Sequence, residues 1–192
     1  VDGPGIRFVV FVQGCPMRCA YCHNPDTWSV NGGTMVTVEH LMDEFQSNHE
    51  FYRSGGITVS GGEPLLQAAF AAEVLAALQA AGVHTAVETS GYAAPDVFRR
   101  VAGHADLVLF DVKHADPVQH RRWTGVDNAP ILRNLAWLCT SGRPFVVRIP
   151  LIPGVNDTRE NMLQTCLLIK DAPGLELSLI HISEPTRHSL IS

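Results

Sequence analysis

The pattern that most constrains this chain is a short loop with three cysteines, Cys15, Cys19 and Cys22, in a C-x3-C-x2-C spacing. The loop follows an apolar run, Phe8 to Val12, that is typical of a buried strand. Three thiolates on one loop can bind a single metal centre. A cubane iron–sulfur cluster is usually held by four cysteines, so three leave one iron free. The spacing therefore favours a metal centre that acts on a bound molecule.

Three other interpretations of the loop stay open at this point. Cys19 to His23 also reads C-x-x-C-H, the attachment pattern of a c-type haem, although this leaves Cys15 without a role. A structural zinc ion held by the three cysteines and His23 would make the chain a binding module without catalysis. Disulfides are the third, but five cysteines is an odd number and the composition is that of an intracellular enzyme.

Length and composition limit the classes of protein to which the chain can belong. Its 192 residues are enough for one domain with a sizeable core. The net charge is −5, and no run of Lys and Arg points to nucleic-acid binding. No apolar stretch approaches the roughly 20 residues of a membrane span. We therefore expect a protein that binds neither nucleic acid nor membranes. We also expect it to be a cytoplasmic monomer.

Strand-like and helix-like segments alternate along the chain, which is typical of an α/β fold with a parallel sheet. Residues of chemical interest follow the strands, and the carboxyl ends of parallel strands meet at one edge of a sheet. The segments at these ends are 15–22, 61–63, 88–90, 111–113 and 148–150. Strands are predicted over 7–13, 57–60, 83–89, 107–113 and 145–150, with another starting at 175; helices are predicted over 36–52, 64–81, 95–101, 117–123, 129–140 and 158–171.

The cysteine loop, with Tyr21 just before its last cysteine, resembles the signature of radical S-adenosylmethionine (SAM) enzymes. The flanking residues, 1–7 and 22–25, resemble the activating enzymes of glycyl-radical enzymes, those of pyruvate formate-lyase in particular. The resemblance runs from Val1 to about Leu177. It implies a partial (β/α)6 TIM-like barrel, which we expect to be truncated at both ends because the chain starts without methionine and inside the motif.

The resemblance also implies the chemistry. Cys15, Cys19 and Cys22 would bind one [4Fe–4S] cluster, whose open iron binds the amino and carboxylate groups of SAM. One electron from the cluster, supplied by reduced flavodoxin or ferredoxin, would cleave SAM into methionine and a 5′-deoxyadenosyl radical. That radical would abstract a hydrogen from a backbone glycine of a partner glycyl-radical enzyme.

Four further segments match SAM contacts of the family. One is Asp111-Val112-Lys113, whose lysine is expected to neutralise a carboxylate or to reach the ribose side. Glu63, in Gly61-Gly62-Glu63-Pro64, matches the acceptor of the SAM ammonium, although a turn into a helix uses the same residues. Arg148 matches a SAM-contacting arginine, with a surface salt bridge as its alternative. Tyr21 matches the aromatic beside adenine, with core packing as its alternative. The predicted cofactor-binding residues are Tyr21, Cys22, His23, Gly61, Gly62, Glu63, Glu88, Thr89, Asp111, Val112, Lys113 and Arg148.

Two features bear on the subfamily. Glu88-Thr89 matches an Asp-Thr pair that, with the aspartate of the next strand, binds a monovalent cation near SAM; the longer Glu88 puts that cation in doubt. The 88–92 segment also reads like activating enzymes of other glycyl-radical enzymes. In contrast, no cysteine-rich insert follows Cys22, which favours the pyruvate formate-lyase type with a single cluster. Cys139 and Cys166 are predicted to be buried thiols.

The end of the chain departs from the resemblance after Leu177. We expect residues 1–177 to form the barrel and 178–192 to be a non-native tail, with an ordinary divergent tail as the alternative. Pro185 prevents a continuous strand or helix through this segment. We therefore predict one short strand near 177–182 and no packed structure after it.

Overall fold

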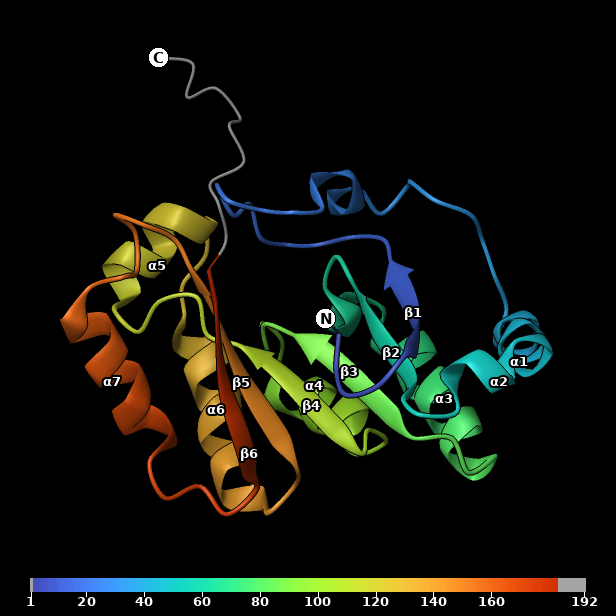
Figure 1. Cartoon of the computed structure of the whole chain (residues 1–192). Helices are drawn as coiled ribbons and strands as arrows, with labels where there is room; N and C mark the ends of the chain where they lie inside the picture. The colour runs from blue at the N-terminus through green and yellow to red at the C-terminus, as the bar shows by residue number, and fades with distance from the viewer. Residues whose placement is uncertain (1, 183–192) are drawn as a thin grey trace.

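The computed structural model describes residues 2–182, with the backbone alone for 177–182. Six strands form one parallel sheet in which the spatial order follows the sequence (Figure 1). The first and last strands are not neighbours, so the sheet is an open, partial barrel, as predicted. The strands are β1 (Arg7–Val12), β2 (Gly56–Gly61), β3 (Thr85–Thr89), β4 (Leu107–Asp111), β5 (Phe145–Leu151) and β6 (Leu175–Ile182).

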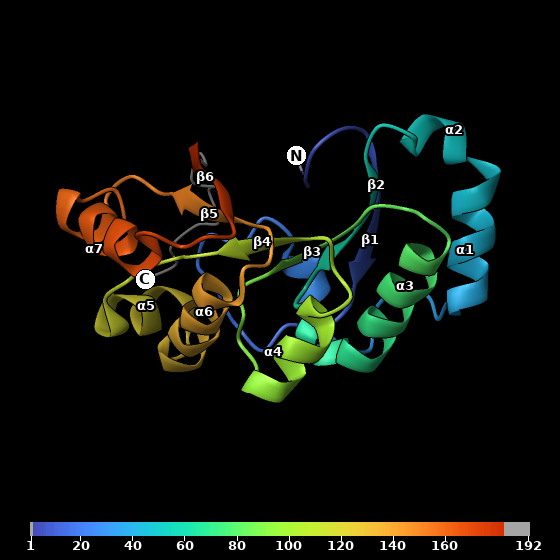
Figure 2. The same cartoon turned by 90° about the horizontal axis from the view of Figure 1, so that it is seen from below.

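Helices connect the strands and cover the outer face of the curved sheet, as Figure 2 shows for α3, α4 and α6. Side-chain caps start several of them; Asp116, for example, accepts a hydrogen bond from the backbone N–H of Gln119 at the start of α5. The helices are η1 (Pro25–Trp28), α1 (Val38–Ser47), α2 (His49–Tyr52), η2 (Pro64–Gln67), α3 (Ala68–Ala80), α4 (Pro95–Ala102), α5 (Pro117–Thr124), α6 (Ala129–Ser141) and α7 (Arg159–Ile169).

Two details differ from the sequence-based predictions. The single helix predicted over 36–52 is two helices that break at Asn48, whose side chain donates to the Glu44 carbonyl. Asparagine competes with the helical backbone in this way. Cys166 is exposed and Cys139 is half-buried, so the prediction of two buried thiols is wrong for Cys166. The helical period of α7 simply places Cys166 on its outer face.

The strands bury both faces, but with different partners. Val108 and Phe110 of β4 pack with the helices in the main core, where Phe98 contacts Phe110 edge to face. The alternate residues of β4, Leu107 and Leu109, point to the concave face. There they form a small cluster of strand residues only, which is completed by Ala86 and Val146. This cluster forms the apolar floor of the concave face, next to the polar residues at the carboxyl ends of the strands.

The last strand crosses the boundary predicted at residue 177. β6 pairs with β5 from Phe145↔Leu175 to Leu151↔Ile182, which confirms the short strand predicted near 177–182. Residues 183–192, the rest of the predicted tail, lie outside the described residues, and the division at 177 stays a prediction. Over the residues that the structure describes, none of the helices is both long and apolar enough to span a membrane.

Candidate active site

One cavity of about 310 Å³ lies at the carboxyl ends of the strands. The three cysteines line it together with residues from β2, β3, β4 and β5, which are up to 133 positions further along the chain (Cys15 to Arg148). Parallel strands in sequential order bring these segments to one edge. Of the predicted residues, the cavity is lined by Cys15, Cys19, Tyr21, Cys22, His23, Gly61, Gly62, Glu63, Glu88, Thr89, Asp111, Lys113 and Arg148.

Val112 is the predicted site residue that does not line the cavity. Its side chain is buried in the main core among the helix-facing residues. Its backbone N–H donates to the Arg148 carbonyl at 2.9 Å and so extends the β4–β5 ladder. Any contribution of Val112 to the site therefore comes from its backbone.

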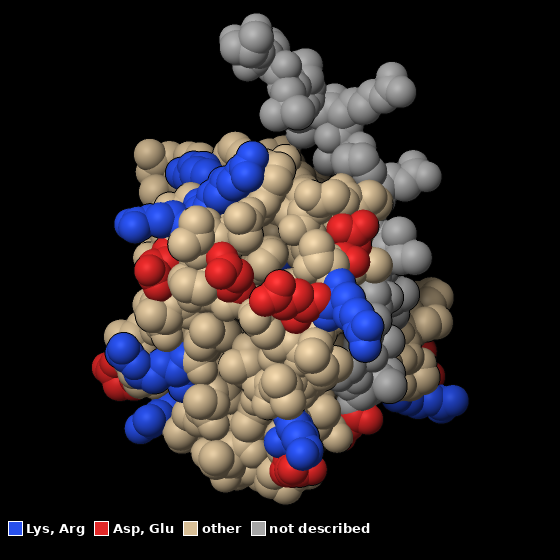
Figure 3. All heavy atoms as spheres, turned by 90° about the vertical axis from the view of Figure 1, so that its left-hand side faces the viewer, with Lys and Arg blue, Asp and Glu red and all other residues tan. Residues whose placement is uncertain are grey.

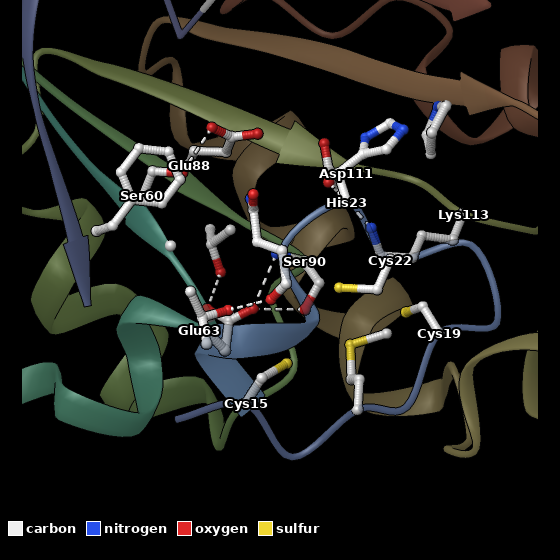
Figure 4. Close-up of a pocket in the computed structure, with 18 of the residues that line it drawn as sticks. Cys15, Cys19, Cys22, His23, Ser60, Glu63, Glu88, Ser90, Asp111 and Lys113 are labelled. Carbon is white, nitrogen blue, oxygen red and sulfur yellow. Dashed lines mark hydrogen bonds and ion pairs between the residues drawn. The ribbon is translucent and has the colours of Figure 1, made fainter. Parts of the chain in front are cut away.

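The cysteine loop is held by backbone hydrogen bonds to two other segments. The Gly14 N–H donates to the carbonyl oxygen of Thr27 at 2.8 Å, and the Ala20 N–H donates to the carbonyl oxygen of Trp123 at 2.9 Å. Figure 4 shows the sulfur atoms of Cys15, Cys19 and Cys22 facing the same space. The fold therefore gathers the three thiols without the help of a disulfide.

Burial keeps two of these thiols protonated in the absence of a ligand. Burial raises the pKa of Cys15 above its ordinary value and that of Cys19 to about 11, while the nearby Lys113 ammonium acts in the opposite direction. Metal binding requires thiolates, so loading this loop must release protons.

The glycines of the Gly61-Gly62 pair serve packing against β1. A Cβ on Gly61 would lie 2.4 Å from the backbone nitrogen of Val12, and Gly61 has a φ of +108°. A Cβ on Gly62 would lie 2.3 Å from the carbonyl oxygen of Gly14. The close approach that these glycines permit is thus to the strand and loop that carry the cysteines. Larger residues would push the two strand ends apart.

Glu63 is a buried carboxylate with a full set of protein donors. It is 2% exposed. One oxygen accepts from the Leu65 N–H at 3.2 Å and from the Thr89 hydroxyl; the other accepts from the Ser90 N–H at 3.0 Å and the Ser90 hydroxyl at 2.6 Å. Burial raises the pKa of Glu63, and the hydrogen bonds from Ser90 and Thr89 oppose this. Glu63 therefore ties the start of η2 to the end of β3, a role that its motif did not predict.

A group of charged side chains from the ends of β3, β4 and β5 lines the same cavity, and Figure 4 shows Lys113 beside Cys19 and Cys22, with Glu88 further from the cysteines. Arg148 Nη1 is 2.6 Å from Glu88 Oε1, and Arg148 Nε is 3.9 Å from Asp111 Oδ1. Lys113 Nζ is 3.0 Å from Asp111 Oδ2. Burial disfavours the charged form of Lys113, but Asp111 outweighs this and raises its pKa well above the ordinary value. Lys113 thus neutralises a carboxylate, as its motif suggested.

The same group does not fit a bound monovalent cation. Glu88 and Asp111, the carboxylates expected to hold it, are both within reach of the Arg148 guanidinium. The second oxygen of Glu88 accepts from the Ser60 hydroxyl at 2.8 Å, and the Thr89 hydroxyl donates to Glu63. The permanent charge of the Arg148 guanidinium therefore already supplies the positive charge that these carboxylates were expected to take from the cation.

Sequence reasoning gave no role to two serines that organise this site, although Ser90 lies in the predicted strand-end segment 88–90. Ser60 holds Glu88, and Ser90 holds Glu63. Ser60 is the second-last residue of β2 and Ser90 follows β3, at the same edge as the cysteine loop, and that position was the only signal available. A single serine belongs to no recognisable sequence motif, so its hydrogen-bond partners could be identified only from the folded sheet.

Comparison with known proteins decides the family. The radical SAM superfamily model matches residues 9–166. The pyruvate formate-lyase-activating enzyme of Staphylococcus epidermidis is 39% identical over 185 residues, which cover 92% of this chain and 74% of that enzyme. The chain belongs to the radical SAM superfamily, among the pyruvate formate-lyase-activating enzymes. The Staphylococcus aureus (strain USA300) enzyme of that name matches with the same identity and coverage.

Solved structures agree on the fold. A domain of pyruvate-formate lyase-activating enzyme from Bacteroides vulgatus superposes with a TM-score of 0.60 at 32% identity, over 65% of this chain and 78% of that chain. SuiB from Streptococcus suis gives a TM-score of 0.73 over 98% of this chain and 42% of its own. Its 12% identity supports the fold alone.

The site fits the cofactors of this superfamily, a [4Fe–4S] cluster and SAM. Among residues 2–182, no three His, Cys, Asp or Glu side chains converge on one metal ion. A single zinc ion would need its thiolates within roughly 4 Å of one another, whereas a cubane binds each thiolate through a different iron. The buried hydroxyl of Tyr21 has no hydrogen-bond partner within residues 2–182, and Tyr21 is one of the residues that line the cavity. An unpaired polar group of this kind is suited to a polar ligand.

Proposed function

We propose that this chain activates a glycyl-radical enzyme, pyruvate formate-lyase, by abstracting a hydrogen from a backbone glycine of that partner. The 39% identity to enzymes with this name over 92% of the chain carries the proposal. The three cysteines and four strand ends that line one cavity support it. A reduced flavodoxin or ferredoxin supplies the electron, and the chain acts as a monomer in the cytoplasm.

The residues of the chain have distinct tasks in this reaction. Cys15, Cys19 and Cys22 would hold the cluster, which when bound supplies the electron that cleaves SAM. Lys113 and Arg148, which line the same cavity, offer positive charge to the SAM carboxylate. The apolar floor below them keeps water away from reactive groups.

The open side of the barrel suits a protein substrate. β1 and β6 do not pair, so the barrel is not closed between them. Phe11 of β1 lines the cavity and is 49% exposed. A glycine-bearing loop of a partner can reach the cavity by this side and cover Phe11.

The test is an anaerobic activation assay with SAM, dithionite and purified pyruvate formate-lyase. We expect a glycyl-radical EPR signal on the partner and one 5′-deoxyadenosine released per radical. SAM cleavage without a radical on pyruvate formate-lyase would contradict the choice of partner. It would favour a different glycyl-radical enzyme, the alternative that the 88–92 segment indicates.

A further inference from the structure

The cysteine loop has two faces with different surroundings. From residue 16 to residue 21, exposed and buried side chains alternate one by one, as they do in an extended segment. Cys19 is on the buried side, so only the backbone of this segment separates its sulfur from the outer face. The outward residues are Pro16, Arg18 and Ala20, and the inward residues are Met17, Cys19 and Tyr21.

The outer face of the loop is continuous with the end of α5. The Arg18 N–H donates to the Thr124 carbonyl at 2.8 Å, and the Ala20 N–H donates to the Trp123 carbonyl at 2.9 Å. The last turn of α5 carries two exposed arginines, Arg121 and Arg122. We call Arg18, Arg121 and Arg122 the basic rim.

The basic rim is a local exception in an acidic chain. The chain has a net charge of −5, whereas the rim has three positive charges. Asp127 borders the same shallow hollow as Arg121 and Arg122. Figure 3 shows basic side chains gathered at the upper edge of the face formed by α5 and α7, with acidic ones below them.

Two tryptophans hold the rim in place. The guanidinium carbon of Arg18 is 5.3 Å from the centroid of Trp28, and that of Arg122 is 5.1 Å from the centroid of Trp123. These are cation–π distances. Trp28 also lines the cavity, so aromatic side chains connect the rim to the site.

We propose that the basic rim is the docking surface for a reduced flavodoxin, a small acidic flavoprotein. This rests on the proposed function, which requires a cluster in the loop and a source of electrons. The flavin gives up one electron and the cluster takes up one electron, and no bond is made or broken. Pro16 and Ala20 are small enough for the flat edge of the flavin to lie close to the loop, while the arginines contact acidic side chains around it.

The rim suits a partner that binds briefly. Electron-transfer interfaces are small, below about 1,200 Å², and complementary charge mainly raises their association rate. Steering of this kind can change the rate by about 10- to 1,000-fold and weakens with ionic strength. The effect of the rim should therefore be on the rate of reduction and on its salt dependence.

The experiment compares two double charge reversals in the cluster-loaded chain. Arg121→Glu/Arg122→Glu alters the rim, whereas Arg99→Glu/Arg100→Glu alters a matched pair in the last turn of α4. Arg99 stacks on Trp137 as Arg122 does on Trp123, and α4 ends at the opposite edge of the sheet. Arg18 is left intact because it donates to the Cys15 and Met17 carbonyls. Cluster bleaching is followed by stopped flow with reduced flavodoxin, with reduced ferredoxin or with dithionite.

We expect the rim variant to be reduced by flavodoxin about ten-fold or more slowly at low salt, with a smaller difference at high salt. The control variant should behave as the unmodified chain does, and dithionite should reduce all three equally. Unchanged flavodoxin rates in the rim variant would overturn the proposal, and a loss seen with ferredoxin alone would overturn the choice of carrier. Absence of SAM cleavage with dithionite would instead overturn the proposed function, while the flavodoxin rates would still decide the docking surface.

Discussion

The two ends of the concave face show how a small shift along a strand changes its role. At the amino end the strands present Ala86, Leu109 and Val146. Two residues further along β3, β4 and β5, the same face presents Glu88, Asp111 and Arg148. Side chains two apart in a strand share a face. The apolar packing residues and the polar site residues therefore differ only in their position along the strand.

The largest effect is expected from substitutions in the cysteine loop, which lines the cavity at the polar end of the concave face. Alanine at Cys15, Cys19 or Cys22 should abolish cluster binding, because a lost thiolate leaves a second iron without a protein ligand. Anaerobic reconstitution and iron analysis should find about four irons per chain without these changes and none with them. Cys139→Ala and Cys166→Ala are the controls, and loss of iron in either would refute the assignment.

Substitutions at the apolar end of the concave face should instead lower the free energy of unfolding. Leu109 is 2% exposed, so Leu109→Ala should lower the free energy of unfolding by about 2–5 kcal/mol. Urea unfolding under anaerobic conditions measures this, with the exposed Leu163→Ala as control. Iron content of the folded variant should stay normal. A loss of iron at normal stability would show that the two ends are not separate.

Glu63 tests whether a residue at the polar end also supports the fold. Glu63→Ala leaves the Leu65, Thr89 and Ser90 donors without their acceptor, and should destabilise the chain by about 1–3 kcal/mol. Glu63→Gln keeps the size of the side chain and should lose less. Thermal unfolding without SAM separates this from ligand binding. Equal melting temperatures in all three proteins would leave Glu63 a role in ligand binding only.

Glu88 should make stability depend on pH. Burial, with the Asp111 charge, raises the pKa of Glu88 from 4.5 to about 7, and Arg148 opposes this. The folded state then binds more protons than the unfolded state between these values, so stability should fall as pH rises from about 4.5 to 7. Glu88→Gln should reduce this fall, and the part that remains is expected from Glu63, whose pKa burial also raises. If the stability of Glu88→Gln fell with pH as steeply as that of the unmodified chain, the pH dependence would belong to another group.

The smallest expected effect concerns the monovalent cation. Because Arg148 already contacts Glu88 and lies near Asp111, SAM affinity should be the same in potassium, sodium or tetramethylammonium salts of equal ionic strength. Calorimetry on the cluster-loaded chain measures it. Arg148→Met should create a dependence on potassium, since two carboxylates would then lack their shared cation. A potassium dependence in the unmodified chain would contradict this reading of the site.

The sequence by itself determined the features that depend on local spacing. The three cysteines, the alternation of strands and helices and the strand ends at which the site lies could all be predicted, because each is a pattern over a few neighbouring residues. Their resemblance to a known family added the cofactors and the partial barrel. Errors at this level had two causes. The helix over 36–52 is broken by the side chain of Asn48, and Cys166 lies on the outer face of α7, where a free thiol is not buried.

Only the tertiary structure decided which side chains meet. Glu63 is held by Thr89 and Ser90, and Glu88 by Ser60 and Arg148, residues 26 to 60 positions apart. The register of parallel strands sets these pairs, as in Asp111↔Arg148, and no local pattern encodes a register between distant strands. For the same reason, three features became visible only in the folded chain: the contacts of Arg148 with Glu88 and Asp111, the glycines packed against β1 and the outward face of the cysteine loop.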